Sequence, residues 1–597
     1  MSAKLLEQYQ GLYSDYSAGQ RLKRKKLNII ALLRLVTFVG GIYLSYQLIT
    51  SNFWYGITLA AAVLALFIYL VVRFVKGKRQ LALLSSLMGI NAREIEALRG
   101  NVKNFDPGEE FRDVQHPFAT DLEIFGEGGL FQHVNRTSTY AGKNQLATWL
   151  LSPLQREAKI RDRQSAVHEL MPMVSWRQRF MAVGYQVSPE HYKDSQLIAW
   201  SKEQPSIAKN RYLKVFRWLL PALTLAALVL FILQILPVGY FLVLGAANLL
   251  VLRKASGRIK AQHQRVTRQM DTLRNYSRLF RHIEHQNFDS TPLNHLKQQF
   301  FADHQSASKA IQKLSHISDA LDNRFNLLVG TLLNLLFLWD LHQVIRLENW
   351  HRHHAAHIEQ WLDALGSFDA FISLAHFAHN HPDFNYPEIS NSTVFEATGT
   401  GHPLIPPNKR VTNDLSIRQH GASLLITGAN MAGKSTFLRT IGVNLVLAMA
   451  GTTVCARDMK FRITRLFTSM NITDSLTRNE SYFYAEIKRL KQLTDHALKQ
   501  GPLLVLLDEI LTGTNTRDKE KASRAFVERL LQMKVNSIIA THDLSLTSLA
   551  QDHPGTLRNA RFEVELENGR MKYDYKLRDG VAQNMNALDL LREMGLI

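Results

Sequence analysis

Cysteine is almost absent from this chain. Cys455 is the single cysteine, and it has no second thiol in the sequence with which to pair. An intramolecular disulfide is therefore excluded, which is typical of proteins that fold in a reducing compartment. We expect the folded bulk of the chain to lie in the cytoplasm.

The chain also lacks a disorder-promoting composition and has fewer acidic than basic residues. Proline, glycine and serine show no enrichment, so we expect nearly all of the 597 residues to fold. A chain of this length is too long to fold around a single hydrophobic core. Asp and Glu number 51 against 71 Lys and Arg, a net charge of +20. Such an excess favours binding to nucleic acid, to an anionic membrane surface, or to both.

Four apolar runs stand in two pairs, at residues 27–50 and 54–75 and at residues 218–236 and 238–252. The first three are long enough to cross a bilayer, while the fourth is shorter. Basic residues flank the outer ends of both pairs: Arg21, Lys23, Arg24, Lys25, Lys26, Arg73, Lys76, Lys78, Arg79, Arg211, Lys214, Arg217, Arg253 and Lys254. This pattern predicts two transmembrane hairpins that enter and leave on the cytoplasmic face. The alternative is that these runs are buried helices of a soluble core.

A basic stretch follows the second pair. Residues 253–283 contain nine Lys or Arg and one acid, Asp271, while apolar residues recur at helical spacing. This predicts a long amphipathic helix whose basic face is either solvated near the bilayer or in contact with a nucleic-acid backbone. An apolar run at 332–339 is too short for a fifth span. A histidine cluster at 351–357 lacks the Cys or carboxylate partners that would complete a metal site.

The C-terminal third carries a phosphate-binding pattern. Residues 423–427 form an apolar run typical of a buried strand, and residues 428–435, Gly-Ala-Asn-Met-Ala-Gly-Lys-Ser, match GxxxxGK[ST]. Such a loop wraps phosphates with backbone N–H groups at a helix N-terminus, while its lysine neutralises the β and γ oxygens and its serine ligates Mg²⁺. We predict ATP and Mg²⁺ as cofactors. The predicted binding residues are Gly428, Asn430, Gly433, Lys434, Ser435 and Thr436.

Two further strands end in polar residues. The apolar run 503–507 precedes Asp508 and Glu509, and the run 537–540 precedes a segment that contains His542. Asp508 would join Ser435 in holding Mg²⁺, Glu509 would orient or deprotonate the attacking water, and His542 would contact the γ-phosphate. Because such polar groups meet at one edge of a parallel sheet, their order predicts a single ATP hydrolysis site.

These motifs resemble the ATPase signatures of the MutS family. The similar segments are Gly-His-Pro-Leu-Ile at 401–405, the phosphate-binding loop with its Asn-Met pair, Asp-Glu-Ile-Leu-Thr-Gly-Thr-Asn at 508–515, and residues 474–486. Upstream, segments between residues 117 and 170 are similar to the start of the MutS helical core. The resemblance implies that Ser481 faces the γ-phosphate of a partner subunit, so that a homodimer completes the site.

The chain also departs from repair MutS. About 115 residues precede the core and the first apolar pair occupies them, which leaves no room for mismatch-reading and connector domains. Arg-Asn-Glu-Ser replaces the usual Gly-Arg-Ser-Thr at 478–481, and Leu-Thr replaces Gly-Arg at 511–512. Mismatch specificity is therefore not expected, and DNA would be bound through its backbone.

We expect a mixed fold, with a mainly α-helical core and two transmembrane helical hairpins followed by an α/β P-loop ATPase domain of the ABC type. The predicted divisions are a cytoplasmic segment at 1–26, hairpins at 27–78 and 211–255, core or lever segments at 79–210 and 256–390, and the ATPase domain at 391–597.

The leading hypothesis is a multi-pass protein of the cytoplasmic membrane whose ATPase faces the cytoplasm and moves helical levers, with DNA as a ligand. The alternatives are half of an ABC-type transporter and a nucleotide-gated membrane scaffold. A transporter is disfavoured because Leu-Ser-Gly-Gly-Gln is absent from the sequence and the separated hairpins offer little polar lining.

Overall fold

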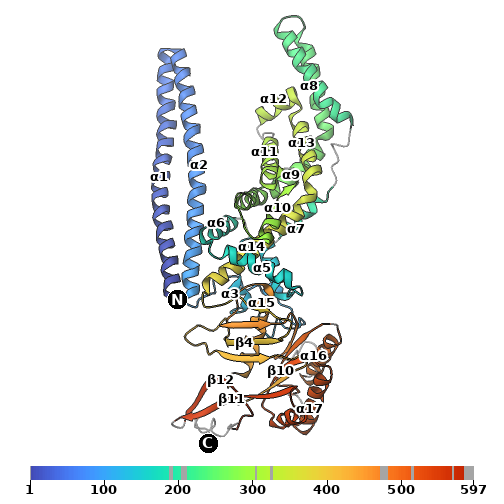
Figure 1. Ribbon diagram of the computed structural model, residues 1–597. Coiled ribbons are helices and arrows are strands. Elements are labelled where there is room, and N and C mark those ends of the chain that lie inside the picture. The colour runs from blue at the N-terminus through green and yellow to red at the C-terminus, as the bar shows by residue number, and fades with distance from the viewer. Residues whose placement is uncertain are drawn as a thin grey trace.

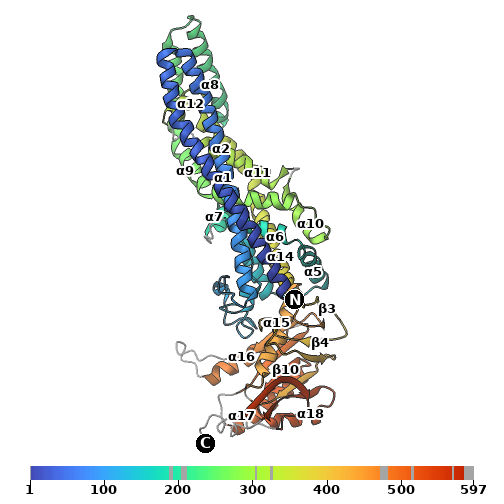
Figure 2. The ribbon, with the colours of Figure 1, turned by 90° about the vertical axis from the view of Figure 1, so that its left-hand side faces the viewer.

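The computed structural model describes residues 2–186, 192–203, 211–302, 305–322, 327–429, 431–470, 482–499, 501–511, 516–567 and 570–583. The described chain is mainly helical, and its two larger sheets lie in the C-terminal part (Figure 1). Two long helical hairpins point away from this α/β unit, with a helical body between them and the sheets (Figures 1 and 2). The expected mixed, helix-rich architecture is confirmed at this level.

The first hairpin consists of α1 (Ser2–Ser51) and α2 (Phe53–Leu98). Asn52 separates them in an extended conformation and caps α2, accepting a hydrogen bond from the Tyr55 amide at 3.4 Å. At the turn a Cβ on Gly56 would lie 2.5 Å from the Ile49 nitrogen, so the close approach requires glycine. Both helices run well beyond the predicted apolar runs, and the predicted boundary at residue 78 falls inside α2.

A buried polar network ties the base of this hairpin to the helical body. Glu94 of α2 accepts a hydrogen bond from the Arg136 Nε at 2.6 Å and lies 3.2 Å from the Nε2 of His376 on α14 (Ile358–Asn380). Tyr9 of α1 donates to the Asn380 side chain at 2.7 Å, and Arg177 lies 3.0 Å from the His376 Nδ1. Helices that are about 370 residues apart in the chain are therefore joined at one point.

The charges in this network influence one another. Burial raises the pKa of Glu94, but the Arg136 guanidinium and His376 outweigh that effect and hold the pKa below its usual range. Burial lowers the pKa of His376, so its ring is neutral at pH 7 and can accept from Arg177 while it donates to Glu94. The network therefore contains one buried ion pair, Glu94 with Arg136, and a second buried cation, Arg177, which donates to the neutral His376 ring.

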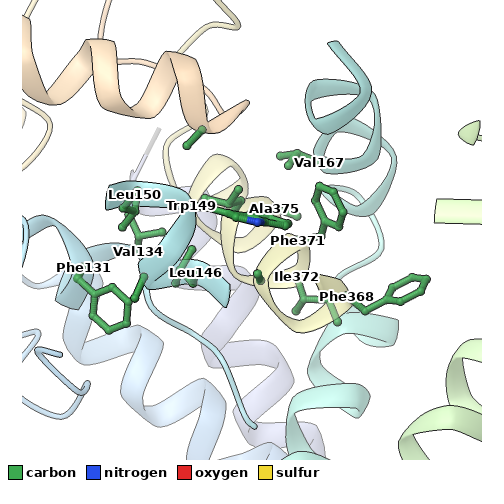
Figure 3. Close-up of a cluster of buried hydrophobic side chains, with 14 of the residues drawn as sticks. Phe131, Val134, Leu146, Trp149, Leu150, Val167, Phe368, Phe371, Ile372 and Ala375 are labelled. Carbon is green, nitrogen blue, oxygen red and sulfur yellow. The ribbon is translucent and has the colours of Figure 1, made fainter. Parts of the chain in front are cut away.

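The helical body packs around α14. Phe368, Phe371, Ile372 and Ala375 of this helix meet side chains from three N-terminal helices (Figure 3). The Trp149 and Phe371 rings meet edge to face with centroids 4.7 Å apart. The remaining elements of the body are η1 (Glu109–Phe111), α3 (Leu130–Val134), α4 (Tyr140–Leu151), α5 (Glu157–Leu170), α6 (Val174–Gly184), α7 (Tyr192–Ser201), α10 (Thr291–Gln298), β1 (Phe301–Ala302), β2 (Gln305–Ser306), α11 (Ala307–Asp322), α13 (Trp339–His354) and η3 (Ala355–His357).

The second hairpin consists of α8 (Arg211–Ile232) and α9 (Val238–Glu284). The predicted long basic helix is confirmed, since α9 continues past the apolar run and buries Val266, Met270, Leu273 and Phe280. Among the described residues, four helical segments are long and apolar enough to cross a membrane, namely α1, α2, α8 and residues 238–267 of α9.

A short apolar helix, α12 (Leu327–Phe337), packs against the second hairpin. The helix contains most of the apolar run at 332–339 and ends at Phe337, before the left-handed Leu338. Asn248 of α9 is fully buried and donates to the Thr224 hydroxyl of α8 at 3.0 Å and to the Leu335 carbonyl at 2.7 Å. One amide therefore joins three apolar helices.

The predicted histidine cluster lies where α13 ends and η3 begins. His353 approaches the Asn349 carbonyl at 2.7 Å, and the His357 ring stacks on Trp361. Each of these histidines is thus engaged by its own helix or by the next one.

The C-terminal unit contains two sheets. The smaller sheet has the order β3 (Glu388–Ile389), β7 (Asp458–Phe461), β4 (Phe395–Thr400), β5 (Asn413–Ile417). The larger has the order β12 (Arg570–Asp579), β11 (Leu557–Glu567), β6 (Ser423–Thr427), β10 (Asn536–Thr541), β9 (Leu503–Asp508), β8 (Arg465–Ser469). All neighbours in it are parallel except β12, which pairs antiparallel with β11.

Helices cover both faces of the larger sheet. Leu424 and Ile426 of β6 belong to the main core with α15 (Lys434–Ala450), whereas Leu425 between them packs in a second core with α16 (Tyr482–Ala497), α17 (Thr516–Gln532), η5 (Leu544–Ser548) and α18 (Leu549–Asp552). Alternate residues of a strand point to opposite faces. A strand buried on both faces must therefore be apolar throughout, which explains the continuous apolar runs in the sequence.

Candidate functional site

The candidate site lies at the carboxyl ends of three adjacent strands. β6, β10 and β9 pair in register, so that Thr427, Thr541 and Asp508 come to the same edge of the sheet. Each strand is followed at once by a segment that the sequence singled out. Adjacency in the sheet, rather than in the chain, brings these segments together.

The loop after β6 leads directly into α15, which begins at Lys434. Gly433 caps the helix in a left-handed conformation with φ 100°, and a Cβ there would also meet the Tyr575 ring at 3.0 Å. Glycine is therefore required for both conformation and space. The first turn of α15 presents backbone N–H groups with no partner inside the helix, which is a favourable environment for an anion.

Lys434 is buried and folds back over this loop. Its ammonium donates to the Gly428 carbonyl at 2.7 Å and to the Ala429 carbonyl at 3.0 Å. Burial lowers the pKa of Lys434, while Glu509 and Asp508 act in the opposite direction. The cation is thus held at the mouth of the loop by neutral carbonyls, which an anionic ligand can replace.

Ser435 and Asp508 contact each other across the sheet edge. The Asp508 carboxylate accepts a hydrogen bond from the Ser435 hydroxyl, which partly offsets the rise in pKa that burial causes. A hydroxyl and a carboxylate oxygen are hard ligands of the kind that Mg²⁺ prefers. These two residues fit the predicted metal site.

Glu509 follows Asp508 in a strained turn. Glu509 and Leu511 have φ values of 50° and 60°, which are uncommon for residues other than glycine. The Glu509 amide donates to the Ala540 carbonyl at 2.9 Å, and its carboxylate lies 3.1 Å from the His542 Nδ1. Both side chains are partly exposed. Strain of this kind persists where the surroundings over-determine the turn.

Glu486 of α16 holds this turn in place, although the sequence analysis predicted no role for this residue. Its buried carboxylate accepts a hydrogen bond from the Leu511 amide at 2.5 Å. The residue lies within the segment 474–486, but nothing in the sequence indicated that it would reach the turn after Asp508. Only the packing of α16 beside the sheet brings the two together.

A cavity of about 360 Å³ adjoins these residues. Lys434, Ser435, Thr436, Gly433 and Glu509 line it, and His402 and Ile405 bring the segment 401–405 to the same place. Burial, together with Arg439 and Arg410, lowers the pKa of His402 to about 4, so its ring is neutral at pH 7. The volume falls within the range of small-molecule sites.

The far wall of this cavity comes from β5 and the β11–β12 hairpin. Tyr575 and Phe562 line it, and Asn413 of β5 donates to the Tyr575 carbonyl at 3.0 Å. No sequence motif marked these residues. They lie far from the loop in the chain and carry no recognisable pattern of their own.

Hydrogen bonds also join the elements around the site to the start of the helical body. Arg489 of α16 donates to the carbonyls of Pro117 at 2.8 Å and Thr468 at 2.9 Å. The Thr468 hydroxyl donates to Asp121 at 2.7 Å, and Arg439 of α15 donates to the Asp121 carbonyl at 3.0 Å. Displacements of α15 or α16 would therefore act directly on the segment that starts the helical body.

Two of the predicted site residues, Asn430 and Ser481, lie outside the described residues. Gly428, Gly433, Lys434, Ser435, Thr436, Asp508, Glu509 and His542 are described and gather at the one sheet edge. Their chemical roles stay predictions.

Family models match most of the chain. The model described as MutS domain III matches residues 119–375, and the model described as MutS domain V matches residues 424–596. The chain belongs to the MutS family. The domain V match includes β6, β9 and β10 with the segments that follow them, and the domain III match includes the second hairpin.

The curated relatives of this MutS-family chain resemble only part of it. The DNA mismatch repair protein MutS of Anaeromyxobacter dehalogenans is 32% identical over 250 residues, covering 39% of this chain and 28% of the relative. The protein of the same name from Lysinibacillus sphaericus is 30% identical over 225 residues, covering 37% and 26%. Human MutS protein homolog 4 is 31% identical over 234 residues, covering 38% and 24%. The chain thus spans about a quarter of the length of these relatives.

Proposed function

We propose that this MutS-family chain is a membrane-anchored ATPase that works as a homodimer. The observation that carries the proposal is the meeting of two residue pairs, Ser435 with Asp508 and Glu509 with His542, beside the loop that holds Lys434. A lysine, a hydroxyl with a carboxylate, and a second carboxylate next to a histidine are the groups that phosphoryl transfer to water requires.

Each group has a defined task in this proposal. Lys434 leaves the carbonyls of Gly428 and Ala429 and neutralises the β and γ oxygens of ATP. Glu509 orients the attacking water and accepts its proton, while His542 contacts the γ-phosphate. Ser435 and Asp508 would hold Mg²⁺, which neutralises phosphate charge when bound. Gly428, Asn430, Gly433 and Thr436 complete the ATP-binding loop.

The central test is hydrolysis of ATP by the detergent-purified protein, with and without DNA of several structures. We expect Mg²⁺-dependent turnover that Lys434→Ala abolishes through weakened ATP binding. A wild-type protein that neither binds nor hydrolyses ATP would refute the proposal.

Dimerisation is tested by mixing two inactive variants. We propose that Ser481 completes the site of the partner subunit, so Ser481→Arg should stop hydrolysis and spare ATP binding by the monomer. A mixture with Lys434→Ala subunits should regain one intact site per heterodimer. Failure of the mixture to recover activity would contradict the shared site.

Attachment to the cytoplasmic membrane, with the ATPase in the cytoplasm, is tested by cysteine labelling of intact cells. The native Cys455 is buried and gives little background. An impermeant reagent should modify Ser51→Cys and Val238→Cys at the exposed hairpin turns and leave Gln419→Cys on the α/β unit unmodified. The reverse pattern would contradict this orientation, and recovery of the protein in the soluble fraction would contradict the anchor.

DNA binding is a second candidate function, favoured by the basic part of α9. Arg265 pairs with Glu203, and Arg274 pairs with Asp319, whereas Arg253, Lys254, Arg258 and Lys260 remain exposed. Contacts to phosphates should give binding that weakens steeply with salt and hardly distinguishes matched from mismatched duplexes. A titration of both duplexes at several salt concentrations tests this, and a strong preference for the mismatch would contradict it.

A further inference from the structure

A second concave site lies beside the middle of α2, away from the nucleotide cavity. It is a groove of about 870 Å³ between α2, which contributes Arg79, and the helices α9 and α11. Four arginines line it: Arg79, Arg274, Arg278 and Arg281. Gln186, which follows α6, also belongs to its lining.

Three of these guanidinium groups have no carboxylate partner in the groove. Arg274 is neutralised by Asp319 and Asp271, whereas Arg278 donates to the Gln186 amide oxygen at 2.9 Å and to Asn275, and Arg281 donates to Gln312 at 3.0 Å. Arg79 has no hydrogen bond or ion pair with the described part of the chain. Three cations therefore converge on one concave surface with only neutral partners.

Two further observations indicate that an anion belongs there. Burial lowers the pKa of Arg278, and the like charge of Arg79 lowers it further, because the two cations repel each other across the groove. The Gln186 Nε2 is buried and has no hydrogen-bond partner among the described residues. An anionic oxygen would relieve the repulsion and satisfy this donor.

The position of the groove indicates where the anion comes from. Arg79 lies four residues after Val75, where the apolar run ends, which is about 6 Å along the helix axis. The two hairpins point in the same direction and stand apart in Figure 1, and both expose large apolar side chains. A phosphate of a lipid whose chains fill the space between the hairpins would lie at the groove.

We propose that this groove binds the phosphate headgroup of an anionic phospholipid. The inference rests on the proposed membrane attachment. Arg79, Arg278 and Arg281 supply the charge, and Gln186 supplies a neutral donor. A nucleic-acid duplex is disfavoured as the occupant, because the exposed apolar hairpins flank the approach to the groove. Basic pockets beside membrane-spanning helices on the cytoplasmic side are suited to such headgroups.

The test is a binding titration in detergent with a short-chain phosphatidylglycerol that carries a fluorescent acyl chain, alongside the matching phosphatidylcholine. We expect phosphatidylglycerol to bind about tenfold more tightly. The variant Arg79→Gln/Arg281→Gln changes two exposed residues of the groove and should weaken this binding by about tenfold or more.

The matched control is Arg258→Gln/Lys260→Gln, which removes the same charge from exposed positions of α9 that lie outside the groove and closer to the apolar run. This control should bind phosphatidylglycerol like the wild type. An equal loss in the control would show that diffuse surface charge attracts the lipid, and the groove assignment would be overturned.

Two competition arms separate the other sources of phosphate. Displacement of the lipid by inorganic phosphate at low millimolar concentration would identify a free-phosphate site instead. Displacement by a DNA duplex whose own affinity falls in the groove variant would identify a nucleic-acid site. Flotation of every variant with vesicles tests membrane attachment separately: a protein that floats without preferring phosphatidylglycerol refutes only the headgroup site, whereas one that does not float refutes the anchor.

Discussion

The charged cluster at the base of the first hairpin and the one at the edge of the larger sheet use their charge differently. At the hairpin base, Glu94 and Arg136 are both fully buried and satisfy each other, with His376 completing the contact. At the sheet edge, Lys434 is held by carbonyls, and Glu509 with His542 remains partly exposed beside a cavity. A small cavity of about 60 Å³ adjoins the first cluster, whereas the second lines a cavity of about 360 Å³ and has groups that a ligand can engage.

The difference shows that buried charge alone does not mark a functional site. Glu94 and Lys434 both have shifted pKa values, but burial and a shifted pKa occur in structural networks as well. The distinguishing features are the larger cavity next to Lys434 and the strained turn at Glu509. Variants of the two clusters should therefore separate stability from activity.

The largest effect is expected for Glu509→Gln. Loss of the general base should lower ATP hydrolysis by about 10² to 10⁴-fold, while ATP binding and the melting temperature stay near the wild-type values. Single-turnover hydrolysis and nucleotide retention measure the two properties. The exposed Glu520→Gln on α17 is the control, and wild-type turnover by Glu509→Gln would remove Glu509 from the mechanism.

Glu94→Gln should have the opposite profile. Removal of one partner of a buried ion pair leaves the Arg136 charge uncompensated and should cost about 3 kcal/mol of folding free energy, while ATP binding to the folded protein persists. Thermal denaturation in detergent measures the loss. The control is Glu96→Gln, which breaks an exposed ion pair with Arg99 and should cost well under about 1 kcal/mol. Similar losses of stability for both variants would argue against a special role of Glu94.

A smaller effect is expected at Glu486, which links α16 to the strained turn. Glu486→Ala removes the acceptor for the Leu511 amide and should lower kcat by about tenfold, corresponding to one lost hydrogen bond to a charged group, with little change in KM. Glu486→Gln keeps an acceptor oxygen and should restore most of the rate. Equal rates for the wild type and the Ala variant would mean that the turn holds its shape without Glu486.

The smallest effect is expected for Asn248→Leu in the second hairpin. Polar contacts between helices in an apolar environment contribute about 0.6 kcal/mol on average, so the melting temperature should fall only slightly. A double-mutant cycle with Thr224→Val isolates the contact between the two side chains. A loss of folding free energy as large as that of Glu94→Gln would show that the Asn248 contacts stabilise the protein far more than polar contacts between apolar helices usually do.

Helices and strands are predicted most accurately from the sequence where one hydrophobic pattern runs through the whole element. The strand at 423–427 matches β6 at both ends, and the strands before Asp508 and His542 match β9 and β10 to within a residue. Strands buried on both faces have continuous apolar runs with polar residues at their ends. The apolar runs predicted hairpin helices that are too short. Outside these runs the helices pack by one face only and carry charged residues on the other faces, so their ends have no continuous apolar pattern.

The sequence by itself determined the loop at 428–435, the carboxylates after β9, the apolar hairpins and the MutS-like segments, because each is encoded by neighbouring residues. Only the tertiary structure decided that Glu486 reaches Leu511, that Tyr575 closes the cavity, that Tyr9 meets α14, and that Arg79 faces Arg278 and Arg281. These contacts join residues that are distant in the chain. Their formation depends on how helices and strands pack, and no local pattern records that packing.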